Sequence, residues 1–441
     1  MKKLALVFFA GIIAFSGCED RVIETITYTI NEPVFMSGRE FRESVKVTTK
    51  SVVISNYGKM CFYDGYIYIS AIDRGIHIID NNDPSNPRNI GFIELMGNAD
   101  IAIRNGILYA DAYNELVWFD ISNPAEPKLE GHLENVFNKF FPFPATENEY
   151  GVDYNLIYDG NGGSKGIIVG WTLAERTETI TNDNRYRRGH FYKEQVGIFA
   201  SNSRTVSSDM VSFNSGSGGS MSFGINGSMS RFALYKDYLY TVINNMMSII
   251  DLSGEEPKKI VDNIQIGWNV ETIFSYKDNM FMGTPTGMLI YSVSNPLKPE
   301  YITSVWHVFG CDPVVVEDDI AYITIHSGNF CGQNANDLII YDVSDVRNPK
   351  HLVTYAMTKP KGLGIDNKTL FVCDDGLKIF DAKNPLTLMG NRLAHYSGME
   401  GYDVIPFNNV LMMIAEDGLY QYDYSDLTAI RQLSRLPIIK Q

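Results

Sequence analysis

The chain has 441 residues, of which 45% are hydrophobic, 20% charged and 12% aromatic, and its formal net charge is −15. A composition this rich in apolar and aromatic residues excludes an intrinsically disordered chain. Because only one long apolar run occurs, a polytopic membrane protein is excluded as well. The acidic balance disfavours attraction to phosphate backbones, so we expect no nucleic-acid partner.

Residues 1–17 have the layout of a secretory signal. Lys2 and Lys3 give a positive start, a twelve-residue apolar run follows, and small residues precede Cys18. The alternative is a transmembrane anchor, but twelve helical residues rise only about 18 Å against a hydrocarbon core of roughly 30 Å. The segment resembles a bacterial lipoprotein signal, although Phe15 stands where that family usually has an aliphatic residue. The resemblance implies that Cys18 is acylated and becomes the new N-terminus.

Acylation would attach a strongly acidic body to a membrane. Without Lys2 and Lys3 the chain has 35 basic and 52 acidic residues, a net charge of about −17. The acyl chains suffice for stable anchoring, so we expect a lipid-anchored protein of the bacterial cell envelope, at the outer membrane. The periplasmic side and the cell surface remain alternatives. Residues 18–57 would then form a lipidated tether with extended stretches, followed by the main body at 58–436.

A recurring phrase organises that body: an apolar run ending in Asp, then Ser or Asn, then a Pro pair. Its anchor residues are Asp80, Asp120, Asp251, Ser292, Asp342, Asp381 and Asp423. Five of the six intervals are 40, 41, 50, 39 and 42 residues, a spacing that indicates a structural repeat. Apolar stretches that alternate around two-residue turns precede the phrase and predict hairpins at Asn105-Gly106, Lys236-Asp237 and Asp318-Asp319.

Four strands per unit of about forty residues predict an all-β fold, namely a single β-propeller of four-stranded blades. A solenoid is the rival, but its repeats are usually shorter. The interval from Asp120 to Asp251 is 131 residues, and we interpret it as one enlarged unit with long insertion loops at about 172–195 and 212–230. This interpretation gives eight repeat units, with seven blades as the alternative.

The repeats resemble the LVIVD-repeat family of bacterial envelope propellers. GIHIID, MSIID, LIIYD and LKIFD carry the resemblance, together with the SNP or NP that follows, and it covers about residues 58–436. Ser292 in place of Asp and a last unit without the Pro pair depart from the pattern. The resemblance implies a propeller that resides in the cell envelope, and it implies little about chemistry.

The repeated Asp has a catalytic or calcium-binding interpretation, because carboxylates are acid/base groups and ligands of hard cations. In a closed ring, however, equivalent positions lie far apart and cannot converge on one site. We therefore expect each anchor carboxylate to accept backbone N–H groups of the turn that follows it.

The cysteines have three interpretations. Cys311 and Cys331 lie at the same end of a hairpin that turns at Asp318-Asp319, so a disulfide is expected in an exported protein. A metal site that adds His307 and His326 is the rival, but no short-spaced ligand pair supports zinc. Cys61 and Cys373 fall in apolar strands and are expected to be buried thiols. Because no nucleophile elbow, phosphate-cradling loop or HExxH occurs, we predict no metal and no cofactor.

One set of charged residues is predicted to converge. If the first strand of each blade is innermost, the residues that begin these strands encircle one mouth of the central channel. Counting back from each hairpin turn gives Lys59, Asp100, Asp153, Arg231, Glu271, Asp312, Lys361 and Asp403. The structural interpretation is that strand ends are usually polar, which alone would explain a charged residue at each position. The functional interpretation is a mixed-charge rim that binds a polar ligand or a protruding loop of a partner.

These observations favour a binding or protein-interaction module for an unidentified protein or glycan, rather than an enzyme. The alternative is a glycan- or ester-processing hydrolase with acids at the channel mouth, namely Asp100, Glu271, Asp312 and Asp403. Paired carboxylates roughly 5–10 Å apart would suit glycoside chemistry.

Overall fold

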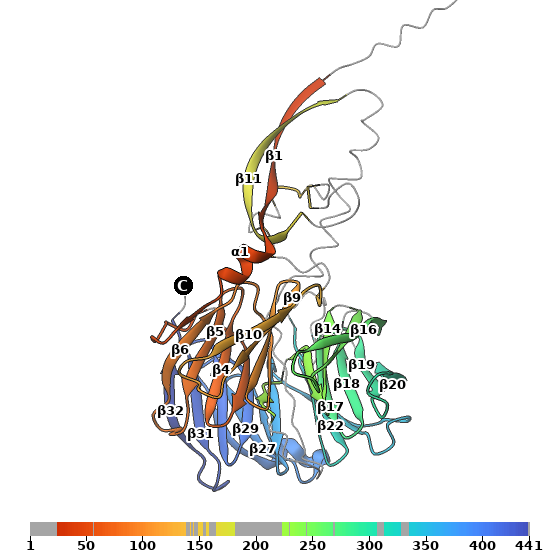
Figure 1. Cartoon of the computed structure of the whole chain (residues 1–441). Coiled ribbons are helices and arrows are strands. Elements are labelled where there is room, and N and C mark those ends of the chain that lie inside the picture. The colour runs from red at the N-terminus through yellow and green to blue at the C-terminus, as the bar shows by residue number, and fades with distance from the viewer. Residues whose placement is uncertain are drawn as a thin grey trace, which may run out of the picture.

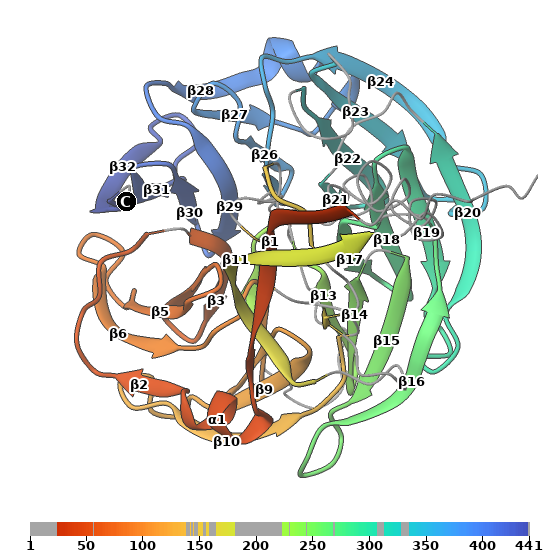
Figure 2. The ribbon, with the colours of Figure 1, turned by 90° about the horizontal axis from the view of Figure 1, so that it is seen from above.

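The computed structural model describes residues 24–55, 57–137, 142, 144, 149–152, 156–157, 165–180, 223–228, 230–243, 245–267, 270–306, 313–327 and 335–439. Within these residues, seven antiparallel blades of four consecutive strands stand around one axis as a β-propeller (Figure 2), and the sheet of the first blade has one further strand at each edge. The predicted all-β propeller is confirmed. Its described blades number seven, the stated alternative, and the count of eight repeat units as blades is wrong.

The blades follow one another along the chain. Blades 1 and 2 consist of β3 (Tyr57–Tyr63), β4 (Tyr66–Ala71), β5 (Gly75–Asp80), β6 (Arg88–Glu94), β7 (Ile101–Arg104), β8 (Ile107–Ala112), β9 (Glu115–Asp120) and β10 (Lys128–Leu133). Blades 3 and 4 consist of β13 (Phe232–Tyr235), β14 (Tyr238–Ile243), β15 (Met246–Asp251), β16 (Lys258–Gln265), β17 (Thr272–Tyr276), β18 (Asn279–Thr284), β19 (Gly287–Ser292) and β20 (Glu300–Trp306).

Blades 5 to 7 complete the ring. Their strands are β21 (Val314–Glu317), β22 (Ile320–Ile325), β23 (Asp337–Asp342), β24 (Lys350–Ala356), β25 (Leu363–Asp366), β26 (Thr369–Val372), β27 (Leu377–Asp381), β28 (Arg392–Tyr396), β29 (Gly401–Phe407), β30 (Val410–Ala415), β31 (Gly418–Asp423) and β32 (Arg431–Pro437). A short 3-10 helix, η3 (Pro385–Asn391), lies between β27 and β28. The ring closes where Ile439 N–H donates to Ile54 O over 3.1 Å.

The enlarged unit between Asp120 and Asp251 does not add an eighth blade, because its strand pairs with a strand outside the ring. Strand β11 (Ile167–Ile180) forms an antiparallel pair with β1 (Glu24–Met36), and this two-stranded ribbon stands on the ring instead of joining it (Figure 1). Because the two strands are far apart in the sequence, their pairing cannot be predicted from a turn motif.

The first strand of each blade is innermost, as expected. Neighbouring first strands contact one another around the axis, from β3 to β7, β13, β17, β21, β25 and β29. The hairpins predicted at Asn105-Gly106, Lys236-Asp237 and Asp318-Asp319 are present as β7–β8, β13–β14 and β21–β22. Asn105 and Gly106 both have positive φ, at 52° and 76°, which suits the twist of a two-residue hairpin turn.

The repeated anchor residue has the structural role that was expected for it. Each anchor side chain accepts the backbone N–H two residues later, and for Asp120 and Ser122 this distance is 2.8 Å. The same bond occurs at Asp80, Asp251, Ser292, Asp342, Asp381 and Asp423. These bonds lower the pKa of the half-buried anchor carboxyls, and that of Asp423 falls to about 2 because Ser425 and Arg431 bond to its carboxylate.

The residues before blade 1 are built onto the ring at the base of the ribbon. Helix α1 (Gly38–Glu43) begins at Ser37, whose hydroxyl and backbone pair with Glu40 in a capping box. Its Phe41 is buried with its ring centroid 5.9 Å from that of Tyr113 in blade 2. Strand β2 (Lys46–Thr48) then pairs with β6 at the outer edge of blade 1. Neither α1 nor η3 is long and apolar enough to cross a bilayer, in the part of the chain that the structure describes.

The ring has two different faces. The inner strands begin, and the outer strands end, at the face that carries the β1–β11 ribbon and the C-terminus (Figure 1), which we call the ribbon face. The opposite face holds the turns between first and second strands and the loops after the anchor residues, and we call it the turn face.

Candidate functional site

A short segment of the insertion lies along the axis of the ring. Residues 223–228 and 230–231, here the axial segment, include β12 (Ile225–Asn226), which pairs with β3 on its axis side. Gly224 N–H donates to Ile103 O over 2.7 Å, and Gly227 N–H donates to Met60 O over 2.7 Å. The segment then becomes β13. The axis beside blades 1 and 2 is therefore occupied by the chain itself.

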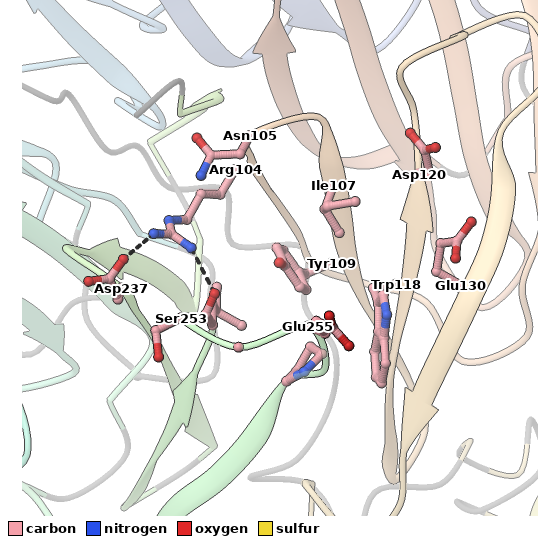
Figure 3. A pocket seen from close by; sticks show the side chains of 13 residues that line it. Arg104, Asn105, Ile107, Tyr109, Trp118, Asp120, Glu130, Asp237, Ser253 and Glu255 are labelled. Carbon is pink, nitrogen blue, oxygen red and sulfur yellow. Dashed lines mark hydrogen bonds and ion pairs between the residues drawn. The ribbon is translucent and has the colours of Figure 1, made fainter. Parts of the chain in front are cut away.

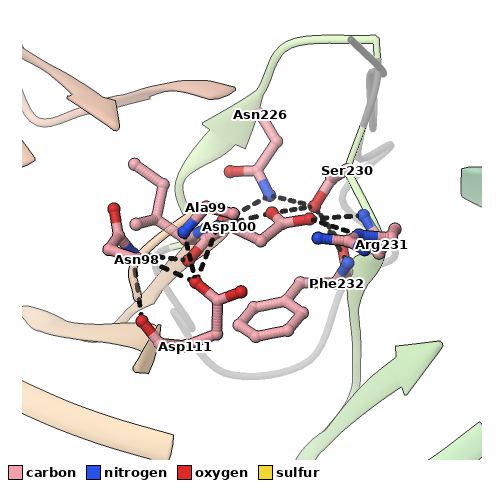
Figure 4. A network of polar contacts seen from close by, with 9 residues as sticks. Asn98, Ala99, Asp100, Asp111, Asn226, Ser230, Arg231 and Phe232 are labelled. Carbon is pink, nitrogen blue, oxygen red and sulfur yellow. Dashed lines mark hydrogen bonds and ion pairs between the residues drawn. The ribbon is translucent and has the colours of Figure 1, made fainter. Parts of the chain in front are cut away.

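Asp100 fixes the end of the axial segment. Its carboxylate accepts the Ser230 hydroxyl over 2.8 Å and the Arg231 backbone N–H over 2.6 Å (Figure 4). Asp111 lies behind it and accepts the backbone N–H groups of Ala99 and Asp100 over 2.6 and 2.8 Å. Burial, opposed by Arg231 and reinforced by Asp100, raises the pKa of Asp111 to about 7.

Asp403, at the start of the inner strand of blade 7, holds the middle of the axial segment. Its Oδ1 accepts the Ser228 N–H over 2.8 Å and the Ser228 hydroxyl over 2.7 Å. The same hydroxyl accepts Leu363 N–H from blade 6 over 3.1 Å, so one serine joins two blades. Burial raises the pKa of Asp403 to about 6, against these hydrogen bonds and the nearby charge of Lys59.

Two glycines let the axial segment fit. A Cβ on Gly224 would lie 2.6 Å from Cys61 Sγ, and one on Gly227 would overlap Asp403 Oδ2. Both contacts are inside van der Waals range, so any side chain would displace the segment or the carboxylate. Within the Gly/Ser-rich residues 212–230, glycine is therefore a packing requirement at these two positions.

The other charged residues predicted at the mouth are spread around it. Lys361 forms an ion pair with Glu400, its ammonium lies 3.8 Å from the Tyr402 ring centroid, and burial lowers the pKa of Lys361. Glu271 begins the inner strand of blade 4, where its N–H donates to Gly283 O over 3.0 Å. The structure brings together Asp100 with Arg231 and Asp403 with Lys59.

Some predicted residues fall outside the described part of the chain: Cys18, Asp153, His307, Cys311, Asp312 and Cys331. His326 is described, and burial together with Lys361 and Lys359 lowers its pKa to about 4. Cys61 and Cys373 are free and buried, as expected. Among the described residues, no three His, Cys, Asp or Glu side chains are grouped to hold a metal ion.

The turn face has a cleft of about 540 Å³ where blades 2 and 3 meet (Figure 3). Tyr109 and Trp118 form part of its wall and are 5% and 7% exposed. At one end Arg104 donates to Leu252 O over 3.0 Å and to the carboxylate of Asp237. This cleft was not predicted from the sequence, although Trp118 is unusual within its repeat.

The family comparison agrees with the architecture. The LVIVD repeat family matches residues 60–93 and 97–134, which are most of blades 1 and 2. Together with the seven described blades, this match gives the class of protein: a β-propeller whose first two blades match the LVIVD repeat.

Two solved structures are similar to the chain at low identity. The periplasmic gluconolactonase PpgL of Pseudomonas aeruginosa has a TM-score of 0.50 and 10% identity, over 87% of this chain and 96% of that chain. A functionally unknown protein from Desulfotomaculum acetoxidans has a TM-score of 0.38 and 12% identity, over 47% of this chain and 69% of that chain. The likeness to PpgL, at 10% identity, shows a common fold only. No curated protein matches the sequence.

Proposed function

We propose that this propeller is a lipid-anchored binding module of the bacterial cell envelope, which presents its turn face to a protein or glycan partner. The observation that carries the proposal is the direction of the ribbon. Strand β1 runs from Glu24 at the far end toward α1 on the ring, and Cys18 lies only six residues before Glu24 (Figure 1). An acylated Cys18 would therefore place the membrane beyond the ribbon and on the ribbon-face side.

The ribbon would then act as a stalk. Thirteen β residues span roughly 40 Å, enough to hold the ring clear of lipid head groups. The base of the stalk is fixed to blade 2, because Arg42 of α1 forms an ion pair with buried Glu115 over 3.0 Å. A fixed base favours one orientation of the ring, with the turn face directed away from the bilayer.

The turn face also has the stiffness of a recognition surface. Its loops are held by the anchor bonds described above, and six of them contain a second side chain that accepts the N–H two residues later. These side chains are Asp83, Asn123, Asn295, Asp345, Asn384 and Asp426. Loops held in one conformation lose little entropy on binding, which favours affinity.

The hydrolase alternative has weaker support. Asp100 and Asp403 are at most 1% exposed, and both carboxylates bond to the axial segment. They cannot contact a substrate while that segment is in place. The likeness to a gluconolactonase concerns the fold, so we do not propose lactone hydrolysis.

Photo-crosslinking in the native host tests the binding function. A crosslinking residue at exposed Arg347 on the turn face should capture a specific partner, whereas the same residue at exposed Lys359 on the ribbon face should not. Capture from Lys359 alone, or from neither position, would contradict the proposal.

Cys18→Ala tests anchoring: it should abolish lipid labelling and release the protein from membranes.

A further inference from the structure

The cleft between blades 2 and 3 lies where the repeat departs from its own pattern. Two residues before the anchor, five blades carry Ile: Ile78, Ile249, Ile290, Ile340 and Ile379. Blade 2 has Trp118 instead, and it pairs with Gly131, where any Cβ would overlap the indole. The indole therefore stands where five other blades have an Ile side chain, and only a glycine fits opposite it.

The loop of blade 3 departs at the same place. Three residues after the anchor it has Gly254, where the other six loops have the Asp or Asn that holds a second turn. The next residue is Glu255, where four loops have a proline: Pro84, Pro124, Pro296 and Pro385. The altered loop brings a carboxylate to the edge of the cleft (Figure 3).

Two polar groups open into the cleft. Tyr240 is the equivalent of Tyr109 in blade 3, since each stands two residues after the residue paired with its anchor. Tyr240 donates to Pro296 O of blade 4 over 2.7 Å. Within the described residues, the Tyr109 hydroxyl and the Trp118 Nε1–H make no such bond, and neither is among the fully buried polar atoms without a partner. The two side chains are more than nine-tenths buried, while their polar atoms remain accessible to a ligand in the cleft.

The charges of the cleft indicate the sign of that ligand. Its lining contains four carboxylates, from Asp120, Glu130, Asp237 and Glu255, against the one guanidinium of Arg104. Arg104 is already paired with Asp237, and Lys128 lies near enough to Asp120 to stabilise its charge. In the described part of the chain Glu130 and Glu255 have no such cation, and both are exposed beside an aromatic wall.

We propose that this cleft binds the guanidinium or ammonium group of an arginine or lysine side chain on a partner protein. The cation would lie between Glu130 and Glu255 and against the aromatic wall, where charge and ring quadrupole both attract it. The Tyr109 hydroxyl can accept one of its N–H donors. The Trp118 N–H can donate to a peptide carbonyl next to the cation, and this favours a protein over a free polyamine. The inference deepens the proposed function and rests on it, because it gives the chemistry of the partner.

Binding of short peptides to the full chain in detergent tests the proposal. The probes are an acetylated hexapeptide with one central arginine, the same peptide with neutral citrulline, and spermidine. We expect the arginine peptide to bind at least tenfold more tightly than the citrulline peptide. We also expect Glu130→Gln/Glu255→Gln to weaken it at least tenfold, while the matched control Glu256→Gln, one residue along the same exposed loop, stays within twofold.

Several results would overturn the assignment. They are equal affinity for the arginine and citrulline peptides, equal effects of the double variant and Glu256→Gln, or absence of measurable peptide binding. Tighter binding of spermidine than of the peptide would assign the cleft to free polyamines. This assay needs no membrane and no native partner, so the two proposals can fail separately. If the peptides do not bind but crosslinking from the turn face succeeds, the cation site is wrong and the proposed function stands.

Discussion

The two faces of the ring are built by different parts of the chain. The ribbon face is built from non-repeating residues: β1 and β11 form the ribbon, and the axial segment is held on the axis through Ser228 and Ser230. On the turn face, the repeat itself supplies every anchor bond. The difference teaches that the repeat provides the scaffold of the ring, while non-repeating residues are added to one face and leave the turn face free for the binding proposed above.

The largest expected effect on the free energy of unfolding comes from replacing a glycine of the axial segment with alanine, compared with the same change on the turn face. Gly227→Ala would force a methyl group into buried Asp403 and should lower the free energy of unfolding by about 3 kcal/mol. Gly390→Ala, in η3 on the turn face, meets no atom within 4 Å and should change it by less than about 0.5 kcal/mol. Urea unfolding of the two variants checks the comparison, and equal midpoints would show that the axial segment does not stabilise the ring.

The carboxylates of the two faces should also differ. Asp403→Asn replaces a buried carboxyl oxygen with an amide NH2 group beside the Oδ1 that accepts two groups of Ser228, so we expect a loss of about 2 kcal/mol. Asp342→Asn changes an exposed turn in which Asn also accepts well, so we expect a loss below about 0.5 kcal/mol. Thermal unfolding of both variants measures the difference, and a larger effect at Asp342 would reverse the account of the two faces.

The loss caused by Asp403→Asn should itself depend on pH. The pKa of Asp403 is raised to about 6 in the folded chain and is near 3.9 when unfolded, so the folded state holds the extra proton between these values. The wild-type carboxyl therefore stabilises the fold more at pH 5 than at pH 8. The loss should shrink by roughly 1 kcal/mol from pH 5 to pH 8. Comparing variant with wild type at each pH cancels the opposing contributions of buried His77 and His326, and a loss that grows with pH would contradict the raised pKa.

The smallest expected effect compares two seams on the turn face. Tyr240→Phe breaks the bond to Pro296 O that ties blade 3 to blade 4, and should cost about 1 kcal/mol. Tyr109→Phe removes the equivalent hydroxyl at the cleft, which makes no such bond to any described residue, and should cost less than about 0.3 kcal/mol. Denaturation midpoints of the two variants measure the difference. Equal losses of stability would mean that the Tyr109 hydroxyl also forms a hydrogen bond between blades in solution.

The repeat made the fold predictable, because each blade contains its own turn chemistry. Asn105-Gly106 marks a hairpin locally, and each anchor residue needs only the N–H two residues later. The number of blades was miscounted because β11 has the pattern of a blade strand yet pairs with β1, a choice that depends on contacts far apart in the sequence. Local periodicity cannot distinguish the two pairings.

The candidate sites were predictable only in part. Counting along the strands found Asp100 and Asp403, but not Ser228 and Ser230, because a Gly/Ser-rich stretch has no periodicity to place it on the axis. The cleft had a signal that was not used, namely the departures from the repeat at Trp118 and Glu255. In a repeat protein, the residues that break the pattern are thus the ones to inspect for function.

The orientation of the ring tests the central claim most directly. A fluorophore is placed at Arg347 on the turn face or at Thr25 near the far end of the ribbon, in the acylated chain bound to vesicles that contain a quencher lipid. The account predicts strong quenching at Thr25 and little at Arg347, because the ribbon would separate the ring from the bilayer. Stronger quenching at Arg347 than at Thr25 would contradict it, since the turn face would then lie against the membrane.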